Sequence, residues 1–187
     1  MILLCSNCLQ IGIVRTNMKI KASDITIGGV MTALAMIFAY IESLIPIPVP
    51  IPGIKLGVAN IAVIAVLYVL GSREAVIINL LRITLTAVLF GNFNSFLFSI
   101  AGGMLSLTVM IALKHTKKFS IVGVSVAGGA AHNIGQVTAA VFLMDTAAIY
   151  YYLPVLLIAG VVTGVVIGIV GGIVTQRVYP VILKNKN

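Results

Sequence analysis

Long apolar runs separated by short polar or charged stretches dominate the chain. The runs do not alternate polar and apolar residues, as the strands of a membrane β-barrel do. Backbone groups in lipid must be paired within their own segment, so such runs fold as helices, each needing about 20 residues to cross the bilayer. The sequence therefore predicts an all-α membrane protein, a bundle of six transmembrane helices at about residues 24–45, 55–71, 74–90, 93–113, 119–143 and 148–178.

Composition supports this assignment. The 187 residues are 60% hydrophobic and 9% charged, whereas soluble domains average about 45–50% apolar and about 25% charged residues. The mean hydropathy is +1.19. The net charge of +8 comes from basic residues at the ends of the apolar runs and not from an aromatic-interleaved basic surface, which argues against nucleic-acid binding.

Basic residues also predict the orientation, because cytoplasmic loops are enriched in Lys and Arg. With the N-terminus inside, ten of the 12 basic residues fall on the inner side: Arg15, Lys19, Lys21, Arg73, Lys114, Lys117, Lys118, Arg177, Lys184 and Lys186. We therefore expect a multi-pass protein of a bacterial cell membrane with both termini cytoplasmic. An N-terminal extension covers 1–23, the six-helix domain 24–178 and a tail 179–187.

The first residues do not resemble a signal peptide, because residues 1–17 lack its basic beginning. Met18 is followed by two lysines, so translation is predicted to start there. Cys5 and Cys8 form a lone CxxC, and a zinc site needs further ligands. The sequence thus predicts neither a metal site nor a cofactor.

A proline-rich segment, IPIPVPIPGIK at 45–55, follows the first predicted helix. Alternating prolines prevent a helix and impose an extended backbone. We expect a stiff strap at the outer face, which is either a rigid connector or a lid over a binding site.

Small residues at a spacing of four mark two of the predicted helices. In the last helix they are Gly160, Gly164, Gly168 and Gly172, a pattern that allows close helix packing inside the bundle. In the first helix Ala35 and Ala39 form a comparable stripe. That stripe is predicted either to pack internally or to dock a partner protein.

Polar residues at membrane depth gather from the midplane outward when positions are counted at about 1.5 Å per residue. A cation there costs about 2.5–3.5 kcal/mol on insertion scales, so Arg82 should face a partner, cavity or ligand. Cationic groups outnumber carboxylates in this set, which favours an anionic substrate. The predicted substrate-binding residues are Glu42, Lys55, Asn60, Arg82, Asn94, Ser95, Ser99, His132, Asn133 and Gln136.

Structural alternatives exist for each of these residues. Arg82 could form an ion pair with Glu42, and His132 could bond to a backbone carbonyl in the core. Buried Asn and Ser side chains also link helices, at about 0.6 kcal/mol each. Their common depth favours a binding pocket over these separate structural roles.

Catalytic motifs are missing from the sequence. It contains no GxSxG, HExxH or P-loop, and no Asp-rich motif for magnesium and diphosphate. The chain is therefore predicted not to be an enzyme.

Five motifs resemble the Gx transporter family, also catalogued as heptaprenyl diphosphate synthase component I, across about residues 24–178. They are ESLIP at 42–46, PGIKLGVAN at 52–60, LFGN at 89–92, SFLFSIAGG at 95–103 and AHNIGQ at 131–136. That family in turn resembles the substrate-binding S components of energy-coupling factor transporters. The resemblance implies a six-helix subunit that captures a vitamin-like solute outside and docks, through Ala35 and Ala39, on a transmembrane coupling subunit with its ATPase subunits. The proline strap would be its gating loop.

The two family names imply different functions. A synthase needs Asp-rich magnesium sites, so under that name this chain could be only a membrane accessory subunit of a heptaprenyl diphosphate synthase. The outward-facing pocket favours the transporter subunit, with a small anionic, vitamin-like or isoprenoid-related solute. A flavin or thiamin-like vitamin, an isoprenoid diphosphate and a quinone precursor all fit this description.

Overall fold

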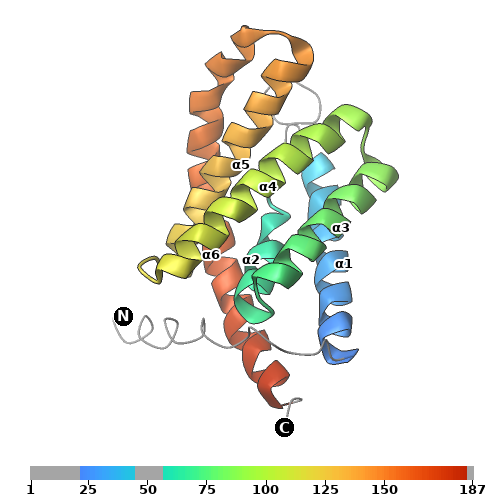
Figure 1. Ribbon diagram of the computed structural model, residues 1–187, viewed down its shortest axis with the longest axis vertical. Coiled ribbons are helices and arrows are strands. Elements are labelled where there is room, and N and C mark those ends of the chain that lie inside the picture. Colours follow the sequence, from blue (N-terminus) through green and yellow to red (C-terminus); the bar gives the residue numbers. More distant parts are fainter. Residues whose placement is uncertain (1–21, 45–56, 185–187) are drawn as a thin grey trace.

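The computed structural model describes residues 22–44 and 57–184, and these residues form helices and short connections without a strand. The predicted all-α, six-helix fold is confirmed (Figure 1). The helices are α1 (Ala22–Leu44), α2 (Asn60–Val69), α3 (Ser72–Phe90), α4 (Phe93–Thr116), α5 (Ile121–Met144) and α6 (Leu153–Lys184), with a 3-10 helix η1 (Ala147–Tyr152) before α6.

Three stretches are long and apolar enough to cross a membrane: Ile25–Leu44, Phe93–Thr116 and Ala147–Val178. The second predicted span, 55–71, is wrong in length. Its helix α2 has only 10 residues, which is about 15 Å and half of a bilayer core. Gly57 (φ 87°) and Gly71 (φ 125°) flank it with a backbone that helices do not adopt.

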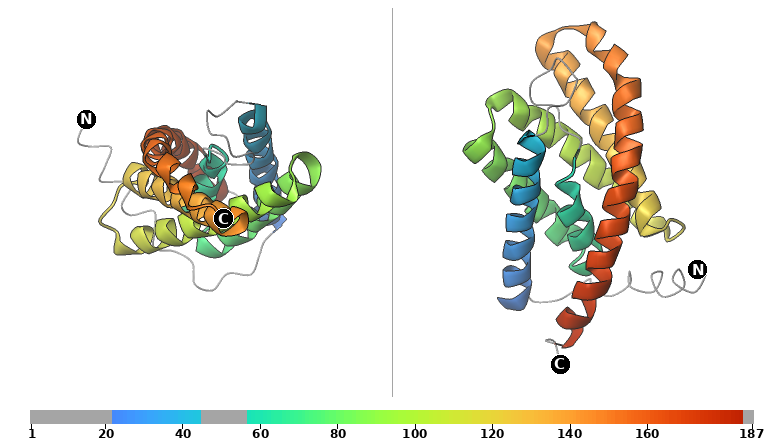
Figure 2. Two further views of the ribbon diagram at one scale, coloured as in Figure 1. Left: turned by 90° about the horizontal axis from the view of Figure 1, so that it is seen from above. Right: turned by 180° about the vertical axis from the view of Figure 1, so that it is seen from behind.

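The short α2 is the centre of the bundle. It contacts α1, α3 and α6, while α5 lies between α4 and α6. Figure 2 shows α2 between α1 and α6 in the view from behind. Every residue of α2 from Asn60 to Leu67 is buried, and its apolar side chains form a core with residues of α1, α3, α4, α5 and α6.

Glycines bring α5 and α6 into backbone contact. A Cβ at Gly160 would lie 2.9 Å from the carbonyl oxygen of Gly129, and one at Gly164 would lie 2.7 Å from the Cα of Val126. Gly168 approaches α5 in the same way, so the predicted internal packing of this stripe is confirmed for three glycines. A Cβ at Gly172 would meet nothing within 4 Å.

The beginning of α1, the α2–α3 and α4–α5 connections and the end of α6 lie at the same end of the bundle (Figure 1). Basic residues of the described part gather there: Arg73, Lys114, Lys117, Lys118 and Arg177. This distribution fits the predicted orientation, although which side of a membrane this end faces stays a prediction. The predictions on 1–17, with Cys5, Cys8 and the start at Met18, and on the strap 45–55 with Lys55 lie outside the described residues.

Candidate substrate pocket

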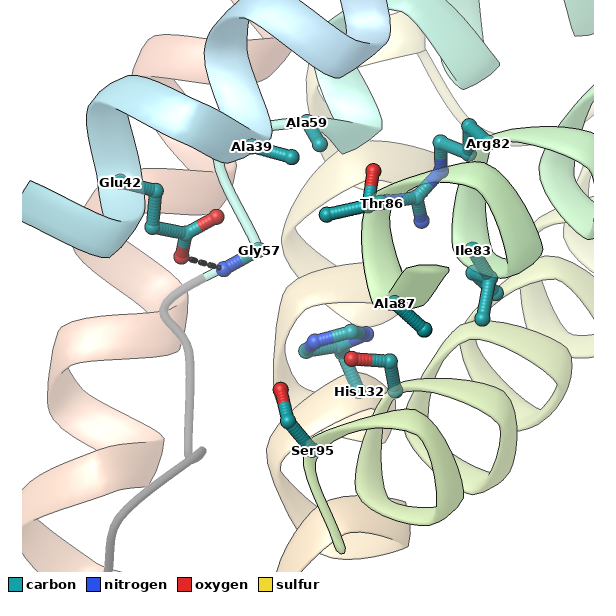
Figure 3. Close-up of a pocket in the computed structure, with 11 residues that line it drawn as sticks. Ala39, Glu42, Gly57, Ala59, Arg82, Ile83, Thr86, Ala87, Ser95 and His132 are labelled. Carbon is teal, nitrogen blue, oxygen red and sulfur yellow. Dashed lines mark hydrogen bonds between the residues drawn. The ribbon is translucent and has the colours of Figure 1, made fainter. Parts of the chain in front are cut away.

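A pocket lies beside the beginning of α2, between α1, α3, α4 and α5 (Figure 3). The space that it leaves for the centres of water-sized molecules is about 20 Å³, room for about one water molecule. Its lining residues are Ala39, Glu42, Gly57, Ala59, Arg82, Ile83, Thr86, Ala87, Ser95, Ser99 and His132. The bundle thus brings together polar groups that are up to 90 positions apart in the chain (Glu42 to His132).

The guanidinium group of Arg82 is held in place by two amide side chains. Its Nε and Nη2 donate to Oδ1 of Asn79 at 3.0 and 2.8 Å, and Nη2 also donates to Oδ1 of Asn60 at 2.8 Å. The side chain is only 6% exposed. Arg82 lies ten positions after the start of α3 at Ser72, about 15 Å along the helix axis and therefore near the middle of this 19-residue helix.

Asn79 in turn fixes this network to α4. Its Nδ2 donates to the carbonyl oxygen of Gly103 at 3.2 Å. A Cβ at Gly103 would lie 2.8 Å from Cδ1 of Ile83 and 3.4 Å from Asn79 Nδ2. The absence of a side chain at this position therefore allows α3 and α4 to approach closely enough for the bond.

Glu42 lies across the pocket from Arg82 and accepts a hydrogen bond from the backbone N–H of Gly57 (Figure 3). Gly57 has a positive φ, and a Cβ there would lie 3.1 Å from Asn60 Nδ2 and 3.2 Å from His132 Cδ2. Among the described residues, the hydrogen-bond partners of Arg82 are amide oxygens and not Glu42. The contacts observed for Arg82 are therefore not those of the alternative structural ion pair.

His132 and Gln136, one turn apart on α5, are joined by a hydrogen bond of 3.0 Å between their Nε2 atoms. Both are buried, and α4 passes very close to them. A Cβ at Gly102 would lie 2.7 Å from both the His132 carbonyl oxygen and Gln136 Cγ. The imidazole that lines the pocket is thus oriented by a side chain on its own helix.

Thr86 contributes a hydroxyl one turn after Arg82. Its side chain is 5% exposed, and its Oγ1 has no hydrogen-bond partner among the described residues. Buried polar atoms in proteins are nearly always bonded. Within the described part of the chain, this hydroxyl therefore has its hydrogen-bonding capacity unused.

The predicted site residues separate into three groups. Glu42, Arg82, Ser95, Ser99 and His132 line the pocket, and Asn60 and Gln136 bond to residues that do. Asn133 is buried but donates to the Leu156 carbonyl oxygen on α6, and Asn94 is exposed at the start of α4. Lys55 lies outside the described residues.

The two alanines predicted to dock a partner are inside the bundle. Ala35 is 0% and Ala39 4% exposed, and Ala39 lines the pocket. In this conformation neither side chain is accessible to another protein, because α2 and α3 pack against α1. Docking at this stripe stays a prediction that this burial disfavours.

Sequence reasoning did not include Asn79, Thr86 and Gly57 among the site residues. Asn79 and Thr86 lie three and four positions from Arg82, on the same helix face, which was a usable signal. No such signal marks Gly57 in the sequence, because this residue contributes its backbone N–H and its positive φ rather than a side chain.

Comparison with protein families matches residues 31–174 to heptaprenyl diphosphate synthase component I. This is well over half of the chain. The chain belongs to this family. Comparisons with curated proteins and with solved structures found no match. The matched stretch contains the whole described pocket, from Ala39 to His132. Component I is by its name one part of a synthase, an accessory subunit rather than the catalytic one, and the family assignment agrees with a membrane-associated protein.

Proposed function

We propose that this chain is the substrate-binding membrane subunit of an energy-coupling factor type transporter and captures a small anionic solute from the outer side. One observation carries the proposal: a buried arginine, fixed by two amides, lines a pocket together with a hydroxyl that has no hydrogen-bond partner among the described residues. Cations at membrane depth mark substrate or ion pathways.

The arrangement around Arg82 suits binding better than helix packing alone. Helix packing would be served by neutral amides, which do not incur the cost of burying a charge. Here Asn60 and Asn79 use their oxygens to orient the guanidinium, so a ligand meets a cation that has already lost its side-chain freedom. Such preorganisation favours affinity.

Solute entry requires the pocket to widen, because about 20 Å³ holds no more than a water molecule. The wall formed by α1 and Gly57 is the natural moving part. The bond between Glu42 and the Gly57 N–H joins the two parts of this wall, and α1 packs mainly on α2 and α3. Opening this wall would expose Arg82 without disturbing the packed pair α5 and α6.

The family name favours a second function, a membrane accessory subunit of a heptaprenyl diphosphate synthase. In that case the partners are synthase subunits, whereas an S component binds a coupling subunit and its ATPases. Affinity purification of the tagged chain from its native membrane distinguishes the two. We expect coupling subunits and ATPases to co-purify; a soluble prenyl synthase in their place, whose product formation requires this chain, would refute the transporter role.

A test of docking through α1 needs a variant that does not disturb the packing of the bundle. Ala35→Leu would add bulk at a buried position, so loss of partners there could reflect misfolding. Ala33→Leu lies on the same helix at an exposed position and serves as the matched variant. If α1 docks through an exposed face, Ala33→Leu should lose the coupling subunit while retaining wild-type thermal stability.

A further inference from the structure

We infer that the pocket binds a single carboxylate group, held by Nη1 of Arg82 and Oγ1 of Thr86 in front of the N-terminus of α2. This rests on the proposed function, in which the pocket holds an anionic solute. It goes further by naming the head group and the atoms that recognise it, and by separating a carboxylate from the diphosphate in the family's name.

Within the described part of the chain, one nitrogen of the Arg82 guanidinium is left for a ligand. Nε and Nη2 are occupied by the amide oxygens of Asn79 and Asn60. Nη1 makes no hydrogen bond with any described residue, and Arg82 lines the pocket. An arginine whose other two nitrogens are bonded presents a charge-assisted donor in a fixed direction, which is how carboxylates are bound tightly.

Thr86 offers the second donor. Other threonines in helices of the described part, Thr32, Thr108, Thr163 and Thr175, donate to the carbonyl four residues earlier at 2.7–2.9 Å. Thr86 makes no such bond, although it is 5% exposed. Its hydroxyl and the Arg82 side chain lie one turn apart on the pocket-facing side of α3 (Figure 3), so both can reach one oxyanion.

The N-terminus of α2 adds a third favourable element. The helix begins at Asn60, and the residue before it, Ala59, lines the pocket and supplies no side-chain cap. The first two N–H groups of α2 donate to the carbonyl oxygens of Gly57 and Val58, so this helix end contributes its positive dipole to the pocket rather than free donors. Discontinuous helices of transporters bind anionic substrate groups in this way.

The charge and size of the pocket decide between head groups. Among the described lining residues, Arg82 is balanced by Glu42, and His132 is the remaining titratable group. A diphosphate carries several negative charges and is usually held by several cations or by Mg²⁺ with carboxylates. A carboxylate brings one charge, and one of its oxygens fits the space that the pocket already has, whereas the rest of the solute needs the widened pocket.

Side-chain NMR of ¹⁵N-arginine-labelled protein in nanodiscs tests this assignment. The Arg82 Nε signal is identified by its loss in Arg82→Lys, and acetate, benzoate, inorganic phosphate and diphosphate are titrated at constant ionic strength. We expect the two carboxylates to shift this signal saturably and the phosphates not to. A stronger response to diphosphate, or no response to any of the four anions, would overturn the inference.

Two matched variants test the hydroxyl. Thr86→Val keeps the shape of the side chain but removes the donor, and should weaken benzoate binding about tenfold, the equivalent of one hydrogen bond to a charged group. Thr84→Val makes the same change at an exposed position of α3 and should leave binding unchanged. If the two variants bind benzoate with equal affinity, Thr86 is not part of the binding site.

Failure of the inference and failure of the proposed function give different results. A co-purified solute that lacks a carboxylate but needs Arg82 for binding would refute the inferred carboxylate head group. The proposed function, capture of a solute, would then still stand. Purification with a synthase partner and no Arg82-dependent solute would refute the proposed function itself.

Discussion

Replacing Arg82 by glutamine should abolish anion binding while leaving the protein folded. The change removes three hydrogen bonds and leaves Oδ1 of Asn60 and Asn79 buried. Each unsatisfied acceptor costs about 1–3 kcal/mol, or about 2–6 kcal/mol for both. Removing a charge from membrane depth recovers about 2.5–3.5 kcal/mol. The free energy of unfolding should therefore fall by at most about 3.5 kcal/mol.

The effect on binding should be larger, because the variant loses the charge and the Nη1 donor together. A hydrogen bond to a charged group contributes about 1.5–3 kcal/mol, which corresponds to roughly 10–150-fold in affinity. Thermal unfolding at increasing benzoate concentration measures both quantities, since a ligand that binds only the folded state raises its stability. Wild-type protein should gain stability with benzoate, and Arg82→Gln should gain none.

Arg73→Gln is the control for this experiment, because Arg73 is an exposed arginine on the same helix. It should respond to benzoate as the wild type does. The reasoning is refuted if Arg82→Gln binds benzoate normally. It is also refuted if the unliganded variant does not fold, because Arg82 would then be a structural element of the bundle.

Two further predictions concern packing. Gly102→Ala places a Cβ 2.7 Å from the His132 carbonyl oxygen, so it should lower the free energy of unfolding by about 1–3 kcal/mol; Gly172→Ala, with nothing within 4 Å, should be neutral or stabilising by up to about 1 kcal/mol. Equal thermal stability of the two variants would contradict the close α4–α5 crossing. Lys114→Met removes the ammonium that donates to the Leu67 carbonyl oxygen at the end of α2 and should cost about 1–2 kcal/mol in thermal unfolding; an unchanged melting temperature would show that this cap contributes nothing.

Much of the fold could be predicted because apolar runs in a membrane chain have few alternatives to helices. The boundaries of α1, α3, α4 and α5 agree with the predicted segments to within three residues. The error at α2 has a physical origin. The apolar residues Leu56, Val58 and Ala59 continue into the apolar run of α2, and hydropathy does not register that Gly57 adopts a positive φ.

Most residues of the candidate site could be predicted from the sequence, but the hydrogen bonds between them could not. Counting residues along helices placed Arg82 and His132 near the midplane and Ser95 further out, and all three line the pocket. Depth does not say which side chains touch, however. Asn60, rather than Glu42, therefore emerged as a partner of Arg82 only from the way α2 packs against α3.

The stripe of Ala35 and Ala39 shows the same limit. Small residues at a spacing of four predict a close approach to another helix, and that helix can belong to the same chain or to a partner. Here α1 turns both alanines into the bundle. Sequence periodicity identifies such a face without identifying what covers it.

The central claim is that the pocket around Arg82 holds a small anionic solute. Native mass spectrometry of the protein purified from its own membrane, beside Arg82→Gln prepared in the same way, tests it most directly. The claim predicts one small acidic molecule bound to each wild-type chain and none bound to the variant. A solute bound equally to both proteins, or wild-type protein that carries none and takes up none of the anions offered, would contradict it.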